Sequence, residues 1–168
     1  MAAMILAMLA IGMAMVARLG VYHALLAWHR PLGVGILVLA VIRTLNRHFS
    51  QLPPFPETMS AAERKMATWS ERLMYGLFFA QPLVGWGMLS AGGYPVEMWG
   101  AVHLPRILPA SPWLYSVLRP LHTVLAYAFM VVVLGHIGAV LYHALVLRDG
   151  LLRRMTISAK RARGAEKK

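Results

Sequence analysis

Three histidines lie in one apolar stretch of the chain, RPLHTVLAYAFMVVVLGHIGAVLYHALV, which starts at Arg119 and ends at Val146. They are His122, His136 and His143, separated by fourteen and then seven residues. An imidazole in hydrocarbon leaves a donor and an acceptor to satisfy, so an ionisable residue inside a membrane span usually marks a transport pathway or a ligand site. Because the chain has no cysteine, metal or redox chemistry has to use histidine.

Membrane helices are the elements that would position these histidines. Of the 168 residues, 59% are hydrophobic and 14% are charged, which is far more apolar than an average soluble domain. Each span needs about 20 residues to cross roughly 30 Å of hydrocarbon, which leaves room for four spans. We therefore predict an all-α fold, an integral membrane four-helix bundle, with spans at about residues 2–17, 25–45, 70–91 and 116–147.

The first predicted span is short for a membrane helix. It begins at Met1, ends at Arg18, and lacks the positively charged leading region of a signal peptide. We interpret it as a span shortened at its N-terminus.

The distribution of basic residues predicts the orientation of the bundle. Of the 17 Lys and Arg residues, 13 flank the 46–69 loop or lie in residues 148–168. By the positive-inside rule, both termini and this loop are cytoplasmic. Residues 156–168 form a basic cytoplasmic tail, which we interpret as a topology determinant against anionic lipid rather than a nucleic-acid site.

This topology brings two histidines from different spans to the same side of the membrane. His29 lies about one turn into the second span and His122 about one turn into the fourth, so the two can face each other at one depth. His136 lies about 21 Å deeper than His122 and about 40° short of four full helical turns, hence on nearly the same helix face. This arrangement suits two planar cofactors stacked across the bilayer, each held between imidazoles. The alternative to a ligand role for each histidine is that it is a packing residue whose imidazole is hydrogen-bonded.

Several longer motifs accompany these histidines. They are PLGVGILVLAVIRTLNR after His29 and Arg30, ERLMYGLFFAQPLVGWGMLSA, WGAVHLP, the His122 and His136 pair, and RDGLLRRM after His143. Together they resemble the bacterial cytochrome b561 family over residues 2–155, and the small four-helix members in particular. We therefore expect a cytochrome b domain over residues 1–155, in the bacterial inner membrane.

The resemblance implies a ligand set for two b-type haems. By motif position, His29 and His122 would be the axial ligands of the outer haem iron, and His136 would be one ligand of the inner haem iron. The family's fourth ligand lies in a His-Trp-Leu motif directly before a run like MAAMILAMLAIGMAMV, and this chain starts just after that point. We expect that the chain is shortened there. The alternatives are that the inner site uses another ligand or is empty.

The resemblance also implies a function. Two imidazoles fill both axial positions of a haem iron, so the expected chemistry is electron transfer, and no catalytic residue is assigned. One enteric member of the family is described as a superoxide oxidase that passes electrons to ubiquinone, and we expect the same reaction here. The alternatives are an electron carrier or membrane anchor for a partner dehydrogenase or hydrogenase, and a scaffold protein that has lost haem.

Basic residues on the outer side could assist such a reaction. Arginines outnumber the single Glu97 there and could steer an anion such as superoxide, or they could pair with haem propionates and lipid headgroups. His143 is expected near the cytoplasmic interface, where it would contact a cofactor carboxylate or extend towards water. These outer arginines are Arg18, Arg30, Arg106 and Arg119.

Overall fold

Four α-helices carry the apolar segments of the chain. The computed structural model describes residues 1–50, 59–99 and 102–148. The helices are α1 (Ala2–Ala17), α2 (Tyr22–Phe49), α3 (Ala61–Ala91) and α4 (Pro112–Leu141). A 3-10 turn, η1 (Leu19–Val21), joins the first two, and a π-helix, η2 (Tyr142–Leu147), extends α4. The predicted all-α membrane bundle is confirmed, with one small addition, a two-stranded β-sheet.

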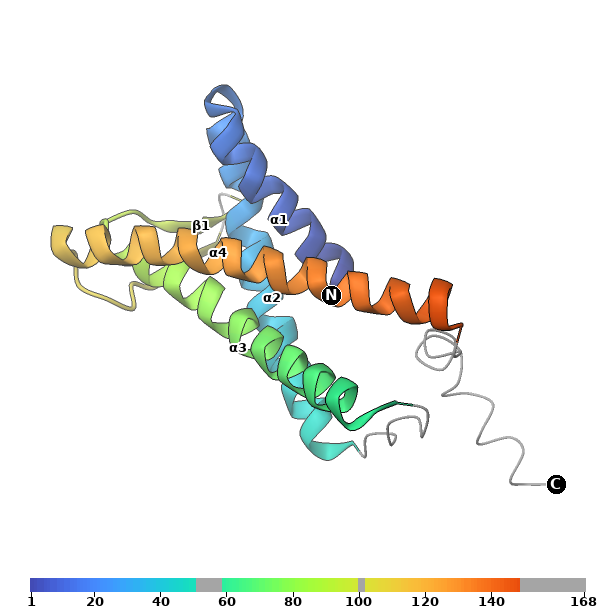
Figure 1. Ribbon diagram of the computed structural model, residues 1–168. Coiled ribbons are helices and arrows are strands. Elements are labelled where there is room, and N and C mark those ends of the chain that lie inside the picture. The colour runs from blue at the N-terminus through green and yellow to red at the C-terminus, as the bar shows by residue number, and fades with distance from the viewer. Residues whose placement is uncertain (51–58, 100–101, 149–168) are drawn as a thin grey trace.

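The helices pack in the order of the chain. α1 packs against α2, α2 against α3, and α3 against α4, and Figure 1 shows α1–α2 and α3–α4 as two hairpins that cross. Two helical stretches of the described chain, Leu19–Phe49 and Pro112–Leu147, are long and apolar enough to cross a membrane, and α1 is apolar but shorter. The tail at residues 156–168 lies outside the described residues.

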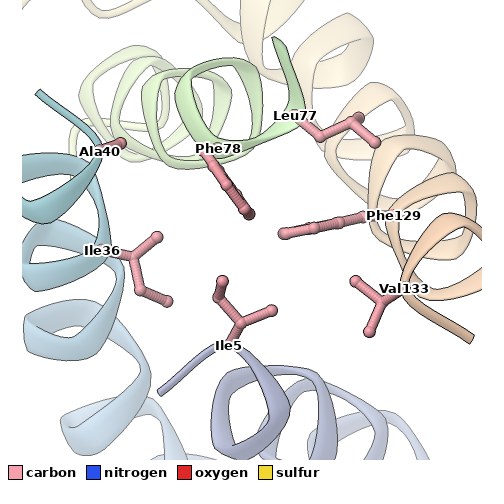
Figure 2. Close-up of a cluster of buried hydrophobic side chains, with 7 residues drawn as sticks. All are labelled: Ile5, Ile36, Ala40, Leu77, Phe78, Phe129 and Val133. Carbon is pink, nitrogen blue, oxygen red and sulfur yellow. The ribbon is translucent and has the colours of Figure 1, made fainter. Parts of the chain in front are cut away.

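A core at the centre of the bundle draws on all four helices. Figure 2 shows its side chains pointing towards one another, with Phe78 and Phe129 meeting edge to face at 5.6 Å between ring centroids. Many large apolar side chains on the outer faces, such as Val131 and Leu134, are more than 60% exposed, as expected for surfaces that contact lipid. The core residues are Ile5, Ile36, Ala40, Leu77, Phe78, Phe129 and Val133.

Local sequence signals set the starts of α3 and α4. Ser60 and Glu63 form a capping box, in which the Ser60 hydroxyl accepts from the Glu63 N–H and the Glu63 carboxylate accepts from the Ser60 N–H. α3 therefore begins at Ala61, well ahead of the apolar span expected from about residue 70. At the start of α4, the Ser111 hydroxyl accepts from the Leu114 N–H, without a reciprocal side-chain bond, and Pro112 occupies the first turn, where its missing N–H costs nothing.

The segment between α3 and α4 forms an ordered cap over one end of the bundle. Strands β1 (Val96–Met98) and β2 (Val102–Leu104) pair antiparallel, and β1 contacts both α2 and α3. The Trp86 indole N–H donates to the Pro105 carbonyl (2.9 Å), and the Ile107 N–H donates to the fully buried Ser90 hydroxyl (3.2 Å). The structure thus shows two paired strands beside the end of α3, to which the residues after β2 are hydrogen-bonded.

Candidate functional site

His29 and His122 meet between α2 and α4. Their ring centroids are 6.2 Å apart, with the planes inclined at 72°. Both side chains are partly buried, and Nδ1 of each ring is buried without a hydrogen-bond partner in the described part of the chain. Buried polar atoms without a partner are rare in folded proteins, and a ligand or metal is one explanation for them. The structure thus brings together the two residues that the sequence placed at one depth.

The spacing of the two rings fits a metal held between them. A metal held between two imidazoles by bonds of roughly 2.0 Å would place the ring centroids about 6 Å apart. The observed separation is 6.2 Å. The donor type also fits, since imidazole is a usual axial ligand of haem iron.

Glycines of the two flanking helices lie beside the rings, and one of them, Gly85, leaves the ring its space. A Cβ added to Gly85 in α3 would lie 3.0 Å from Cε1 of His122, closer than nearly all real contacts. A Cβ on Gly12 in α1 would lie 3.9 Å from Cε1 of His29. The site is therefore bordered by all four helices, and Gly85 is the position where a side chain would displace a candidate ligand.

Two further polar side chains lie beside the pair. Gln81 of α3 donates from Nε2 to the His122 carbonyl oxygen (3.1 Å), and the same atom lies 3.3 Å from Nε2 of the His122 ring. Oε1 of Gln81 and Nε of Arg30 are buried without partners among the described residues. Arg30 was expected near the outer cofactor, whereas the sequence analysis did not identify Gln81. The feature that could have indicated Gln81 is a carboxamide inside the apolar sequence of α3.

Each of three helices carries an internal proline next to the site. Pro31 follows His29 closely, Pro82 follows Gln81, and Pro120 precedes His122. A proline inside a helix removes one backbone hydrogen bond and bends the helix, which a membrane helix tolerates where neighbouring groups compensate. Each of these helices therefore lacks one backbone N–H donor at the level where the polar groups gather.

His136 lies in α4 with a different environment. It is partly buried, and no described residue makes a hydrogen bond, an ion pair or a ring contact with it. A Cβ added to Gly135 or Gly138 beside it would meet nothing within 4 Å. The structure therefore places His136 on the expected helix, beside open space, and does not bring a second imidazole to it within the described chain.

The remaining predicted residues lie at the two ends of the bundle. Arg119 is exposed on α4, with its guanidinium 6.0 Å from the centre of the Tyr115 ring, and donates to the Tyr115 hydroxyl (3.4 Å). His143 lies in the π-helix that follows α4 and contacts the Tyr142 ring edge to face, 6.1 Å between centroids. Neither side chain meets the His29 and His122 pair.

Comparisons with known proteins agree with this architecture. Residues 1–157 match the family model described as prokaryotic cytochrome b561. The chain is 29% identical to cytochrome b561 homolog 2 of Escherichia coli K12 over 81% of this chain and 72% of that protein. It is 31% identical to the probable superoxide oxidase CybB of Yersinia pestis, over 76% of this chain and 72% of that protein. The chain therefore belongs to the prokaryotic cytochrome b561 family of membrane-integral proteins, which transfer electrons through the membrane by means of b-type haem.

Proposed function

We propose that this protein oxidises superoxide at its outer face and delivers the electrons to ubiquinone through two b-type haems. In the balanced reaction, two superoxide anions each lose one electron and leave as dioxygen, and one quinone takes up both electrons and two protons. The similarity to a probable superoxide oxidase supports the choice of substrate. The observation that carries the proposal is the His29 and His122 pair, whose 6.2 Å spacing suits one iron between two imidazoles.

His29 and His122 would hold the outer haem, and His136 would supply one ligand of the inner haem. A haem bound by these residues would supply a one-electron redox centre. The protein would orient the imidazoles of the proposed ligands. Phe129 lies seven residues from each α4 histidine and packs on Phe78, so an apolar aromatic layer separates the two levels.

Cationic side chains would serve the outer haem and its anionic substrate. Arg30 is adjacent to His29, and its buried Nε, which has no partner among the described residues, would be available for a haem propionate. Arg18, Arg106 and Arg119 are exposed, so they can attract an anion to this end of the bundle. His143 would lie near the inner haem, at the cytoplasmic end of α4.

The proposed location is the bacterial inner membrane, with multiple spans and both termini cytoplasmic. The support is the positive-inside rule, since 13 of the 17 basic residues lie on the side of the 46–69 loop and the C-terminus. Fusions of green fluorescent protein or alkaline phosphatase to the C-terminus test this. The fluorescent protein should be bright and the phosphatase inactive; an active phosphatase would reverse the orientation.

The function is tested with the purified full chain in detergent. Haem is counted per chain, and superoxide is then generated enzymatically in the presence of a short-chain ubiquinone. We expect quinol formation that depends on superoxide and on the protein, with the His122→Ala variant as control. Two low-spin haems without quinol formation would instead favour an electron carrier or anchor subunit for a partner dehydrogenase or hydrogenase. A chain without haem would favour a scaffold role.

A further inference from the structure

Two arginines of α2 lie against one tyrosine of α3. Arg43 and Arg47 are four residues apart, so they are neighbours on one face of α2. The Arg43 Nε donates to the Tyr75 hydroxyl (3.0 Å). The guanidinium carbons of Arg43 and Arg47 lie 6.0 Å and 5.4 Å from the centre of the Tyr75 ring. A single side chain of α3 therefore holds two cationic groups of the neighbouring helix in one place.

Only one of these two cations is paired with an acid. Glu71 of α3 accepts hydrogen bonds from both terminal nitrogens of Arg47. Arg43 is exposed, and no described carboxylate forms an ion pair with it. Because Tyr75 takes up only the Nε of Arg43, its two terminal nitrogens remain as donors without a partner among the described residues. The cluster thus carries one uncompensated positive charge on a guanidinium that is already oriented.

This charge lies where the surface of α2 changes from apolar to polar. Residues 36–42 contain no charged side chain, whereas residues 43–48 include two arginines and a histidine. Two apolar side chains next to Arg43 in the sequence, Ile42 and Leu45, are each 55% exposed, as expected for side chains that contact lipid. The Arg43 guanidinium is therefore expected at the level of the phospholipid headgroups, beside surfaces that can contact acyl chains.

We propose that Arg43, held by Tyr75, binds the headgroup phosphate of an anionic phospholipid at the end of the bundle where α2 ends and α3 begins. A guanidinium binds phosphate through two parallel N–H···O bonds, and basic pockets between membrane helices on the cytoplasmic side bind anionic headgroups. Arg47 contributes less, because Glu71 already accepts from it. The site is separate from the histidines and does not depend on the proposed function.

The test is lipid binding to the purified full chain in a neutral detergent, with bound lipids counted by native mass spectrometry. Phosphatidylglycerol and phosphatidylcholine with the same acyl chains are compared, and the anionic lipid should bind more tightly. Arg43→Gln should weaken phosphatidylglycerol binding by about tenfold, as expected for the loss of charged hydrogen bonds. Tyr75→Phe removes only the hydroxyl that orients Arg43, so it should weaken binding less.

Glu71→Gln should have the opposite effect, because it frees Arg47 for the phosphate and removes a nearby negative charge. An effect in this direction cannot come from loosened packing. Glu71→Gln that binds phosphatidylglycerol no more tightly than wild type would contradict the proposal.

Lys65→Gln is the matched control. Lys65 is exposed near the start of α3, so its substitution removes the same charge from the same end of the bundle, and binding should stay within about twofold of wild type. Equal losses in Lys65→Gln and Arg43→Gln would mean that net charge alone attracts the lipid, which would overturn the proposal. Equal affinity of the wild type for the two lipids would overturn it as well. Displacement of phosphatidylglycerol by millimolar inorganic phosphate would show that the site takes a free anion instead of a lipid.

Discussion

The two histidines of α4 share a helix face but differ in their surroundings. His122 meets a second imidazole from α2 and a carboxamide from α3, and its ring is accommodated by a glycine. His136, fourteen residues along the same helix, has no hydrogen bond, ion pair or ring contact with a described residue, and the glycines on either side of it face open space. At the level of His122, helix packing brings two imidazoles together. At the level of His136, the described residues provide one imidazole beside open space.

This difference predicts a difference in cofactor affinity between the two levels. Ligands held in place before binding lose little conformational freedom when the metal arrives, whereas each side chain that must be ordered costs roughly 0.5 to 1.5 kcal/mol. At the outer level, the paired rings are already 6.2 Å apart. We therefore expect the outer haem to be retained more tightly than the inner one during purification or on mild denaturation.

The largest expected effect is the loss of a whole haem. His122→Ala removes one of the two proposed ligands of the outer haem and leaves His29 alone, so that haem should be lost while the haem proposed at His136 remains. His136→Ala should remove the inner haem and spare the outer one. Haem content per chain, together with the split of the low-temperature visible bands, measures both outcomes.

These two variants also check that the levels are independent. A chain that lost both haems in either variant would show that the two levels depend on one another. Full haem content in His122→Ala would remove that residue from the ligand set. Circular dichroism of each variant verifies that the helices remain folded.

The next effect comes from the space beside His122. Gly85→Ala places a Cβ 3.0 Å from Cε1 of the ring, so the imidazole has to shift and the outer haem should bind more weakly. Gly76→Ala is the matched control in the same helix, because a Cβ there meets nothing within 4 Å. Alanine should stabilise α3 at Gly76 by up to about 1 kcal/mol through helix propensity. Haem titration of the two variants measures the contrast.

The same substitution tests what occupies the open space at the inner level. A Cβ added to Gly135 meets no atom within 4 Å in the described structure, so Gly135→Ala should leave the haem content unchanged if that face contacts lipid alone. Where a haem lies against the glycine, the added methyl group should lower the content of the inner haem. An unchanged haem content in both Gly135→Ala and Gly85→Ala would argue that neither glycine borders a cofactor.

Much of the fold could be predicted from apolar segment lengths, while polar turns and contacts between helices could not. The first helix, Ala2–Ala17, coincides with the predicted span because its residues are almost all apolar. α2 continues past the predicted end because Arg47 forms a bidentate ion pair with Glu71 of α3, which stabilises polar turns that hydropathy alone does not show. The capping box at Ser60 could have been recognised from its sequence.

The site was predictable where topology alone determines proximity. His29 and His122 were expected at one depth because both lie one turn inside the outer ends of their spans, and the structure brings their rings together. Gln81 was not expected beside His122. Its contact with His122 depends on how α3 is rotated against α4, and a single sequence does not determine that rotation. The ligation of iron by these residues stays a prediction.

A moderate effect is expected from charge at the outer end. Neutralising Arg18, Arg106 and Arg119 together as glutamines should slow the reaction with superoxide by about tenfold at low salt, because electrostatic steering raises encounter rates of ions. The difference from wild type should shrink as ionic strength rises. Arg72→Gln is the control, because Arg72 stacks on Trp69 near the opposite end of α3 and should leave the rate unchanged.

The smallest effect concerns the polar contacts at the inner end, where α2 and α3 are joined far from the histidine pair. Glu71→Gln removes the ion pair with Arg47, while Arg43 keeps its hydrogen bond to the Tyr75 hydroxyl (3.0 Å). The two paired side chains are about one third exposed (34% and 33%), so the loss should stay under about 1 kcal/mol in unfolding free energy. Thermal unfolding measures this change. His122 contacts Gln81 and lies against Gly85, and neither contact involves this ion pair, so the spectrum of the haem proposed at His29 and His122 should be the same as in wild type. A changed outer spectrum in Glu71→Gln would mean that α3 transmits movement along its length, and that the outer site depends on how the inner end is held.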